Sequence, residues 1–208
     1  LYQPSHGSID QVRGNPDLDE EDVYSCDLGL EHKFSKDVAL NVTLFRTDTR
    51  DYITYLRGVD LIYRPVNISR AYKQGVELSL TSVVSKRLSV DISYVYQDTE
   101  DEDRDDELYY SPQHNLKVTG KFHLPAGTKV ETILKSVSHQ YSSSAGGNPY
   151  KLDGHSVVNL KIIQPVPVEI FSGEFFVHFY NLFDTDFESH AGYPDDGVRF
   201  MAGMNINF

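Results

Sequence analysis

VRFMAGMNINF, residues 198–208, alternates in chemistry from one residue to the next. One face of this segment is apolar and carries Phe200, Ala202, Met204, Ile206 and Phe208, whereas the other face is mostly polar. A period of two residues predicts a β-strand with one apolar side. Chain ends usually fray into water, so a soluble domain has little reason to end on a large apolar side chain. The segment therefore predicts a strand whose apolar face meets either lipid or a second sheet.

The composition of the whole chain is compatible with a membrane β-barrel. Tyr occurs 14 times and Phe 11 times, and aromatic residues favour strands and the interfacial girdles of barrels, although Trp is absent. No apolar run approaches the roughly 18 residues of a membrane-spanning helix, and no signal peptide is recognisable. Barrel strands need only about ten residues of alternating pattern, so a mean hydropathy of -0.41 does not exclude them.

Alternation recurs along the chain and predicts about nine antiparallel strands. They span roughly residues 24–34, 38–52, 68–81, 88–96, 116–124, 128–141, 158–165, 175–184 and 198–208. Short connections at 35–37, 85–87 and 125–127, with a middling one at 165–173, alternate with long ones at 53–67, 98–113, 142–153 and 185–197. Transmembrane barrels have short periplasmic turns at one end and longer extracellular loops at the other. The pattern therefore predicts an all-β, up-and-down transmembrane barrel wall.

The direction in which the apolar side chains point separates the barrel wall from its main alternative, a soluble sandwich. In a barrel wall, one set of apolar residues lies on the outer surface of a single curved sheet: Leu28, Leu30, Leu40, Val42, Leu78, Leu80, Val90, Ile92, Leu116, Val118, Leu160, Ile162, Met204 and Ile206. In a soluble sandwich-type binding module, the same residues would be buried between two sheets. The long strands, with long loops at one end only, favour the barrel wall.

The formal net charge of -12 is concentrated in two stretches. Residues 17–22 and 98–107 supply the whole acidic excess, so the sequence offers no basic surface for nucleic acid. The acidic stretch 98–107 has carboxylates for Ca²⁺ but lacks the Asp-x-Asp-x-Asp-Gly register of a calcium loop, which favours a solvated, mobile loop. Cys26 is the single cysteine, so no internal disulfide forms, and no Cys/His cluster has zinc spacing.

A barrel enzyme is a third alternative. His139, His155, His178 and His190 are available together with several Asp residues. However, no Ser lies in a nucleophile-elbow sequence, and no His/Asp/Ser set is suggested by spacing. The sequence therefore predicts structural histidines and no enzymatic activity, cofactor or resident metal.

Several segments carry a resemblance to a known family. They are GNPDL at 14–18, NISRA at 67–71 followed by QGVE at 74–77, SPQH at 111–114, NLFD at 181–184, and GYP at 192–194 followed by Gly197, Arg199-Phe200 and Phe208. In this order and spacing, the sequence resembles the C-terminal part of the β-barrel of a TonB-dependent outer-membrane receptor. One departure is Asp19-Glu20-Glu21, where the family usually has Lys-Pro-Glu.

The resemblance implies a fold, a location and a function. Residues 1–208 would be the C-terminal portion of one ~22-stranded outer-membrane barrel, without its plug domain. The intact protein would take up a scarce solute such as a ferric siderophore or a cobalamin-like ligand. TonB would contact an N-terminal segment that is not in this chain. Met204, Ile206 and Phe208 resemble the signal that the bacterial barrel-assembly machinery reads.

The resemblance, together with the predicted strands and loops, suggests roles for individual residues. Tyr55 and Arg57, with Tyr63, lie in the predicted connection 53–67, and Tyr109 and Tyr110 lie in the predicted loop 98–113; all five are candidate ligand contacts. Gly75 and Gly203 are expected on the inward face, where they leave room for a plug or for close backbone approach. Asn181 and Asp184 are expected to hydrogen-bond turn backbone where a strand enters a loop.

The predicted strand count has a further consequence. With nine antiparallel strands, the first and the last run in the same direction, so closing them on each other would need a parallel seam. Bacterial single-chain barrels use even numbers of strands. We therefore expect an open sheet, whose missing strands lie upstream in the intact protein, or whose edges drive association if the segment is prepared alone.

Overall fold

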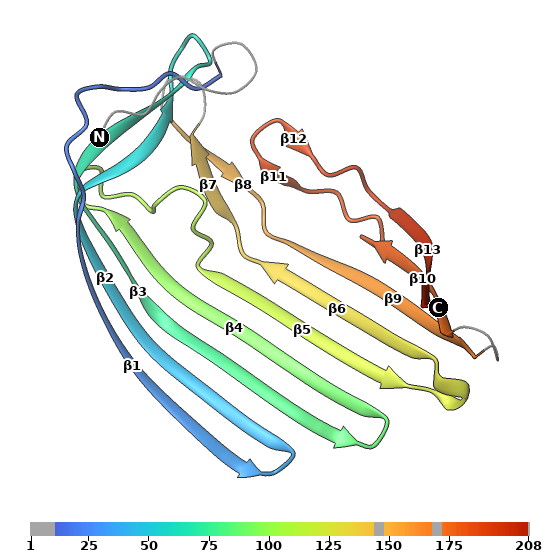
Figure 1. Cartoon of the computed structure of the whole chain (residues 1–208). Helices are drawn as coiled ribbons and strands as arrows, with labels where there is room; N and C mark the ends of the chain where they lie inside the picture. The colour runs from blue at the N-terminus through green and yellow to red at the C-terminus, as the bar shows by residue number, and fades with distance from the viewer. Residues whose placement is uncertain (1–10, 144–147, 168–171, 208) are drawn as a thin grey trace.

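The computed structural model describes residues 11–143, 148–167 and 172–207, and in this part of the chain nine strands form one antiparallel sheet (Figure 1). Strand order in the sheet follows the order along the chain. The strands are β1 (Asp22–Ser35), β2 (Val38–Arg57), β3 (Tyr63–Ser85), β4 (Leu88–Asp101), β5 (His114–His123), β6 (Lys129–Val137), β9 (His155–Pro167), β10 (Ser172–Tyr180) and β13 (Arg199–Asn207). The predicted up-and-down, all-β wall is confirmed.

Two small hairpins stand on the long connections at one end of the sheet (Figure 1). One consists of β7 (Gln140–Ser143) and β8 (Pro149–Leu152), and the other of β11 (Glu188–His190) and β12 (Tyr193–Pro194). The opposite end has tight connections, one of which is the 3₁₀ turn η1 (Pro125–Gly127). We call these the long-loop end and the short-turn end. Among the described residues, no helix is long and apolar enough to cross a bilayer.

The register places the predicted apolar residues on one face of the sheet. Paired residues of antiparallel strands point to the same side, and one row across the sheet reads Leu30, Val42, Leu78, Tyr94 and Leu116. The pairings carry this face on to Ile162, Met204 and Ile206. All fourteen residues expected on the outer surface share it.

No second sheet covers this apolar face within the described residues. Leu28 and Leu30 keep exposed fractions of 68% and 67%, and Met204 keeps 48%. A sandwich would bury such side chains, because each sheet needs the other to cover its apolar face. The sandwich alternative is therefore wrong, and the apolar face is the uncovered outer surface of a single sheet, as expected of a barrel wall.

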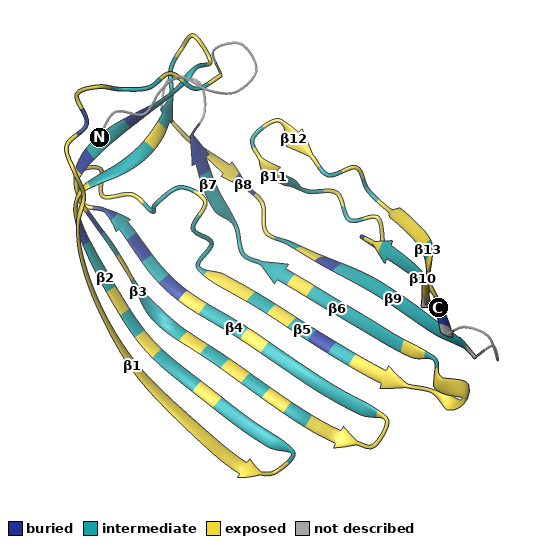
Figure 2. Cartoon of the chain, viewed as in Figure 1, coloured by how far each residue is buried: buried dark blue, intermediate teal, exposed yellow. Residues whose placement is uncertain are grey.

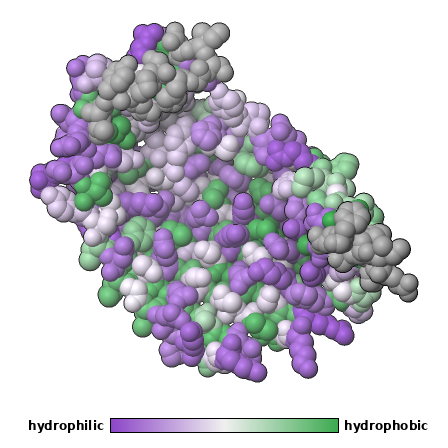
Figure 3. Space-filling view, viewed as in Figure 1, coloured by the Kyte–Doolittle hydropathy of each residue, from purple (hydrophilic) through white to green (hydrophobic). Residues whose placement is uncertain are grey.

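The opposite face is polar and concave. The hollows of the structure are lined mainly by residues of this face, among them Thr43, Lys73, Gln97 and Lys117. Figure 3 shows many hydrophilic side chains distributed over the strands. Alternation along each strand thus sends polar side chains inward, as expected of a barrel lumen.

The sheet is open. β1 and β13 are its two edges, and no strand pairing joins them in the described part of the chain. Every residue of β1 is exposed (Figure 2). This arrangement confirms the expectation, drawn from the odd strand count, that these strands do not close on each other.

Several predicted boundaries at the long-loop end are wrong. The predicted connection 53–67 is mostly strand, because β2 and β3 keep pairing up to Arg57 and Tyr63 and leave only residues 58–62 between them. β4 likewise continues into the predicted acidic loop as far as Asp101. The predicted strand 128–141 is divided between β6 and β7, and the predicted loops 142–153 and 185–197 contain strands of the two hairpins. At the short-turn end, the predicted connection 165–173 overlaps β9 and β10, and residues 168–171 lie outside the described part.

The two inward-facing glycines are explained by close packing. A Cβ atom on Gly75 would overlap the main-chain oxygen of Tyr96, and one on Gly203 would lie 2.5 Å from the ring of Phe176. Both positions therefore leave no room for a side chain, as expected of glycines where backbone or a large ring approaches closely.

Candidate functional site

Segments that are distant in sequence meet at the long-loop end (Figure 1). The Arg57 amide at the end of β2 donates to the Ser143 hydroxyl of β7 at 3.1 Å. The Tyr110 amide, in the loop after β4, donates to the Tyr141 carbonyl of β7 at 2.8 Å. The Tyr110 ring lies 4.9 Å from the ring of His190 in β11. These contacts hold the β2–β3 hairpin, the loop after β4 and both small hairpins in one cluster.

Three of the five candidate ligand-contact residues lie in this cluster. The Arg57 guanidinium stands over the Tyr63 ring, 5.5 Å from its centre, because the two residues are paired across the hairpin. Burial raises the pKa of Tyr110, and the nearby Tyr63 phenol adds to this shift. A guanidinium stacked on an aromatic face, with phenols beside it, suits an anionic aromatic ligand.

The other two candidate residues have different surroundings. Tyr55 pairs with Pro65 in the β2–β3 hairpin and keeps 37% of its surface exposed. The Tyr109 hydroxyl accepts a hydrogen bond from Arg104 Nη1 at 3.1 Å. Both therefore stand at the long-loop end.

Carboxylates of the acidic stretch tie the loop after β4 to the sheet. The Asp103 carboxylate accepts the Ser69 amide at 2.6 Å, and this hydrogen bond lowers the pKa of Asp103. The Asp101 carboxylate accepts the Asp103 amide at 3.0 Å, and Arg104 lies 3.7 Å from it. Nowhere in the described ranges do three or more acidic, His or Cys side chains form a group that could hold a metal ion.

A second polar region lies on the inner face of the wall, below the small hairpins. A hollow of about 500 Å³ is lined by Lys117, Lys135, Tyr180, Phe187 and Arg199, with other residues. His155 stacks on Phe187 with ring centres 4.0 Å apart, and burial lowers the pKa of His155. Sequence reasoning did not single out these lysines, because only the strand register shows that Lys117 and Lys135 are direct neighbours.

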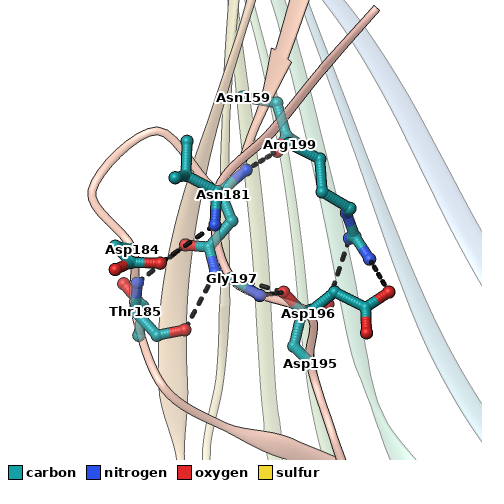
Figure 4. Close-up of polar contacts among 9 residues, drawn as sticks. Asn159, Asn181, Asp184, Thr185, Asp195, Asp196, Gly197 and Arg199 are labelled. Atoms are coloured by element: carbon teal, nitrogen blue, oxygen red, sulfur yellow. Dashed lines mark hydrogen bonds and ion pairs between the residues drawn. The ribbon is translucent and has the colours of Figure 1, made fainter.

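Asn181 organises the connection from β10 to the β11–β12 hairpin (Figure 4). Its side chain accepts the Thr185 amide at 2.9 Å and donates to the Thr185 carbonyl at 2.9 Å and to Asp195 Oδ1 at 3.2 Å. The backbone amide of Asn181 donates to Asn159 Oδ1 at 2.9 Å. Asp184 Oδ1 accepts the Val198 amide at 2.9 Å. The expected hydrogen bonding of Asn181 and Asp184 to turn backbone is confirmed.

The same connection positions Arg199 on the inner face. Arg199 makes ion pairs with Asp195 at 3.1 Å and with Asp196 at 3.2 Å (Figure 4). Because Asp195 also accepts from Asn181, the turn and the first residue of β13 are linked through one carboxylate. This network fixes the rim of the hollow.

Comparisons with known proteins agree with this architecture. Residues 2–182 match the family described as TonB dependent receptor-like, beta-barrel. The chain is similar to the iron-regulated outer membrane virulence protein of Vibrio cholerae serotype O1, with 24% identity over 232 aligned residues that cover 95% of this chain and 32% of that protein. It thus spans about a third of the length of this relative.

Solved structures share the fold. The closed form of the ferric-catecholate import receptor Fiu from E. coli K12 superposes with a TM-score of 0.72 at 21% identity, covering 93% of this chain and 29% of the receptor. The copper transporter OprC also gives a TM-score of 0.72, at 17% identity, covering 90% of this chain and 32% of the transporter. These relatives are receptors and transporters, and none is a barrel enzyme. The chain therefore belongs to the TonB-dependent receptor family and is part of an outer-membrane β-barrel.

Proposed function

We propose that the intact protein containing this chain imports a metal chelate across the outer membrane and contacts it at the long-loop end. The observation that carries this proposal is the cluster of Arg57, Tyr63 and Tyr110, which come from the end of the β2–β3 hairpin and from the loop after β4. Tyr55 and Tyr109 stand at the same end and are proposed as additional contacts. Long, outward loops are where binding residues concentrate on a rigid scaffold.

A ferric siderophore is the proposed cargo. The Vibrio cholerae relative is described as iron-regulated, and Fiu is described as a ferric-catecholate import receptor. The combination of a stacked arginine and phenols supports a ligand with aromatic, negatively charged groups. Two other cargoes are a cobalamin-like solute and, since OprC is described as a copper transporter, a copper species.

The proposed context of the chain follows from its open sheet. Residues 1–208 form the C-terminal portion of a ~22-stranded barrel domain, with β1 and β13 pairing with strands elsewhere in the intact protein. TonB contacts a segment outside this chain, and outer-membrane lipid covers the apolar face.

Substitutions in the intact receptor test the ligand-contact proposal. We expect Arg57→Gln to weaken binding of ferric tris-catecholate at least about tenfold, equivalent to about 1.4 kcal/mol, as measured by isothermal titration calorimetry. Arg87→Gln is the matched control, because Arg87 lies in the short turn after β3 at the other end of the sheet. The proposed contact would be contradicted if the Arg57→Gln variant bound each of three ligands as tightly as the unmodified receptor does. The three ligands are ferric tris-catecholate, ferric tris-hydroxamate and cobalamin.

The C-terminal strand is the proposed assembly signal. Met204 and Ile206 lie on the apolar face of β13, and Phe208 lies outside the described residues. Deleting Phe208 from the intact receptor should reduce its insertion into the outer membrane without changing ligand affinity of the inserted molecules. Normal surface levels after the deletion, measured by whole-cell labelling, count against this role.

A further inference from the structure

We infer that Asn67 is a positioning residue of the long-loop end, because it fixes a bend in the β2–β3 hairpin. Through this bend it holds Arg57 and Tyr63 next to Tyr110. The inference rests on the proposed function, because its consequence is the affinity of the receptor for the chelate. It gives a role to the stretch NISRA, residues 67–71, which contributes no residue to the proposed contacts.

The pairing between β2 and β3 is interrupted at Asp51 and Ser69 and resumes beyond them in the same register. Asp51 has a positive φ of 52°, a left-handed conformation that is foreign to an extended strand. The Asp51 carbonyl accepts Asn67 Nδ2 at 2.6 Å, and the Ser69 amide donates to the Asp103 carboxylate at 2.6 Å. Side chains therefore satisfy backbone groups at the interruption. In Figure 1 the outer part of this hairpin runs in a different direction from the part in the wall.

Asn67 joins this bend to the segment that precedes β1. Its Nδ2 also donates to the Asp19 carbonyl at 3.2 Å, and its Oδ1 accepts the Asp19 amide at 2.9 Å. One side chain thus bonds main-chain groups of two segments, at Asp51 and at Asp19. An amide suits this task because it carries both a donor and an acceptor, whereas a carboxylate of the same size would keep only the acceptor.

The segment that precedes β1 also contacts the outer part of the hairpin. Asn15 Nδ2 donates to the Pro65 carbonyl at 3.0 Å. Tyr63 makes two backbone hydrogen bonds of 2.9 Å with residues 11–13. This segment therefore supports the hairpin in its bent direction, and Asn67 connects the two at the bend itself.

The direction of the hairpin determines where Arg57 stands. Arg57 lies six residues beyond Asp51 in β2, which corresponds to about 20 Å at the usual rise of a strand. A rotation of about 10° at the bend would move Arg57 by about 3.5 Å over this length. Binding constellations need their groups held within about 0.5 Å. The contact of the Arg57 amide with Ser143, at 3.1 Å, depends on the same direction.

Spin labels measure this direction in the intact receptor. Val59 is 87% exposed in the turn of the hairpin, and Lys117 lies in the wall on β5, so the distance between labels at these positions depends on the bend. We expect a narrow distance distribution in the unmodified receptor and a wider one in Asn67→Ala. The matched control is Asn41→Ala, which should keep the narrow distribution because Asn41 lies opposite Ser79 in the uninterrupted part of the hairpin.

Asn67→Asp separates the hydrogen bonds of Asn67 from the size of its side chain. This variant keeps an acceptor for the Asp19 amide but loses the donor to Asp51. It should therefore widen the distance distribution as Asn67→Ala does. Because it is isosteric, it also tests the inference if the alanine variant does not insert into the membrane. A narrow distribution in Asn67→Asp overturns the inference.

Ligand affinity tests whether Asn67 acts through Arg57. We expect Asn67→Ala to raise the Kd for ferric tris-catecholate at least about fivefold in the unmodified receptor. The increase should be smaller when Arg57→Gln is already present, because sites this far apart have additive effects unless they are coupled. An equal or larger increase in the Arg57→Gln background overturns the inference, and so does an unchanged Kd in Asn67→Ala.

The proposed function fails in a different way. If Arg57→Gln binds ferric tris-catecholate as tightly as the unmodified receptor does, the contact that Asn67 would position is refuted, and the inference falls with it. If Arg57→Gln weakens binding while Asn67→Ala changes neither the label distances nor the Kd, the proposed function stands and the inference alone is refuted.

Discussion

Replacing Asn181 by alanine should loosen the connection between β10 and β13 more than replacing it by glycine. Asn181 is 2% exposed, and its side chain makes three hydrogen bonds, two with Thr185 and one with Asp195. It also has a positive φ of 49°. Asn tolerates this left-handed conformation better than most residues, and alanine does not share that tolerance.

The expected size of the effect follows from these contacts. Three lost hydrogen bonds cost roughly 0.5–1.5 kcal/mol each, and more where a buried partner is left unsatisfied. Alanine in the left-handed region adds about 1 kcal/mol, which glycine avoids. We therefore expect Asn181→Ala to lower the free energy of local opening by about 3 kcal/mol, and Asn181→Gly by about 2 kcal/mol.

Hydrogen exchange of the intact receptor measures this opening. About 3 kcal/mol corresponds to exchange on the order of 100-fold faster for amides that depend on the turn. The Thr185 amide, which donates to Asn181, and the Val198 amide, which donates to Asp184, report on it directly. Amides of β2 serve as the internal control. Exchange within about threefold of the unmodified receptor, or faster exchange for glycine than for alanine, would refute the reasoning.

Three further predictions concern the wall and its rim. Leu78→Arg on the lipid face should lower the free energy of unfolding in lipid vesicles by about 2–4 kcal/mol, whereas Ser79→Arg on the inner face should cost much less. Gly75→Ala should reduce the yield of folded receptor on heat-modifiability gels, because the added methyl overlaps a main-chain oxygen of β4. Burial lowers the pKa of His155 in the folded protein, so the contact between His155 and Phe187 should be most stable above the ordinary histidine pKa of about 6.5 and weaken as pH falls below it through the lowered pKa. His155→Phe should remove this pH dependence from hydrogen exchange of β11 and β12.

The lipid-facing part of the wall can be predicted from the sequence, because contact with lipid requires a regular pattern of apolar residues. Every second residue of a lipid-facing strand must be apolar, so Val42, Leu78 and Ile92 are recognisable before any register is known. Asn181 was also predictable, since a short polar side chain next to a loop satisfies turn backbone.

The strand boundaries at the long-loop end were not predictable, because the alternating pattern does not extend to that end of the sheet. Residues 53–57 and 63–67 form the distal parts of β2 and β3, where both faces carry mixed side chains and no alternation marks a strand. Backbone hydrogen bonds continue there without a pattern in the side chains. The juxtaposition of Lys117 and Lys135 was likewise hidden, because it depends on the register between β5 and β6.

The central claim is that this chain is a barrel wall with lipid on one face and the lumen on the other. Spin labels at positions 40–44 of β2 in the intact, reconstituted receptor test it most directly, through their accessibility to oxygen in lipid and to a water-soluble nickel complex. Labels at Leu40, Val42 and Leu44 should be accessible to oxygen, and labels at Asn41 and Thr43 should not. The same accessibility at all five positions, or the reverse alternation, would contradict the account.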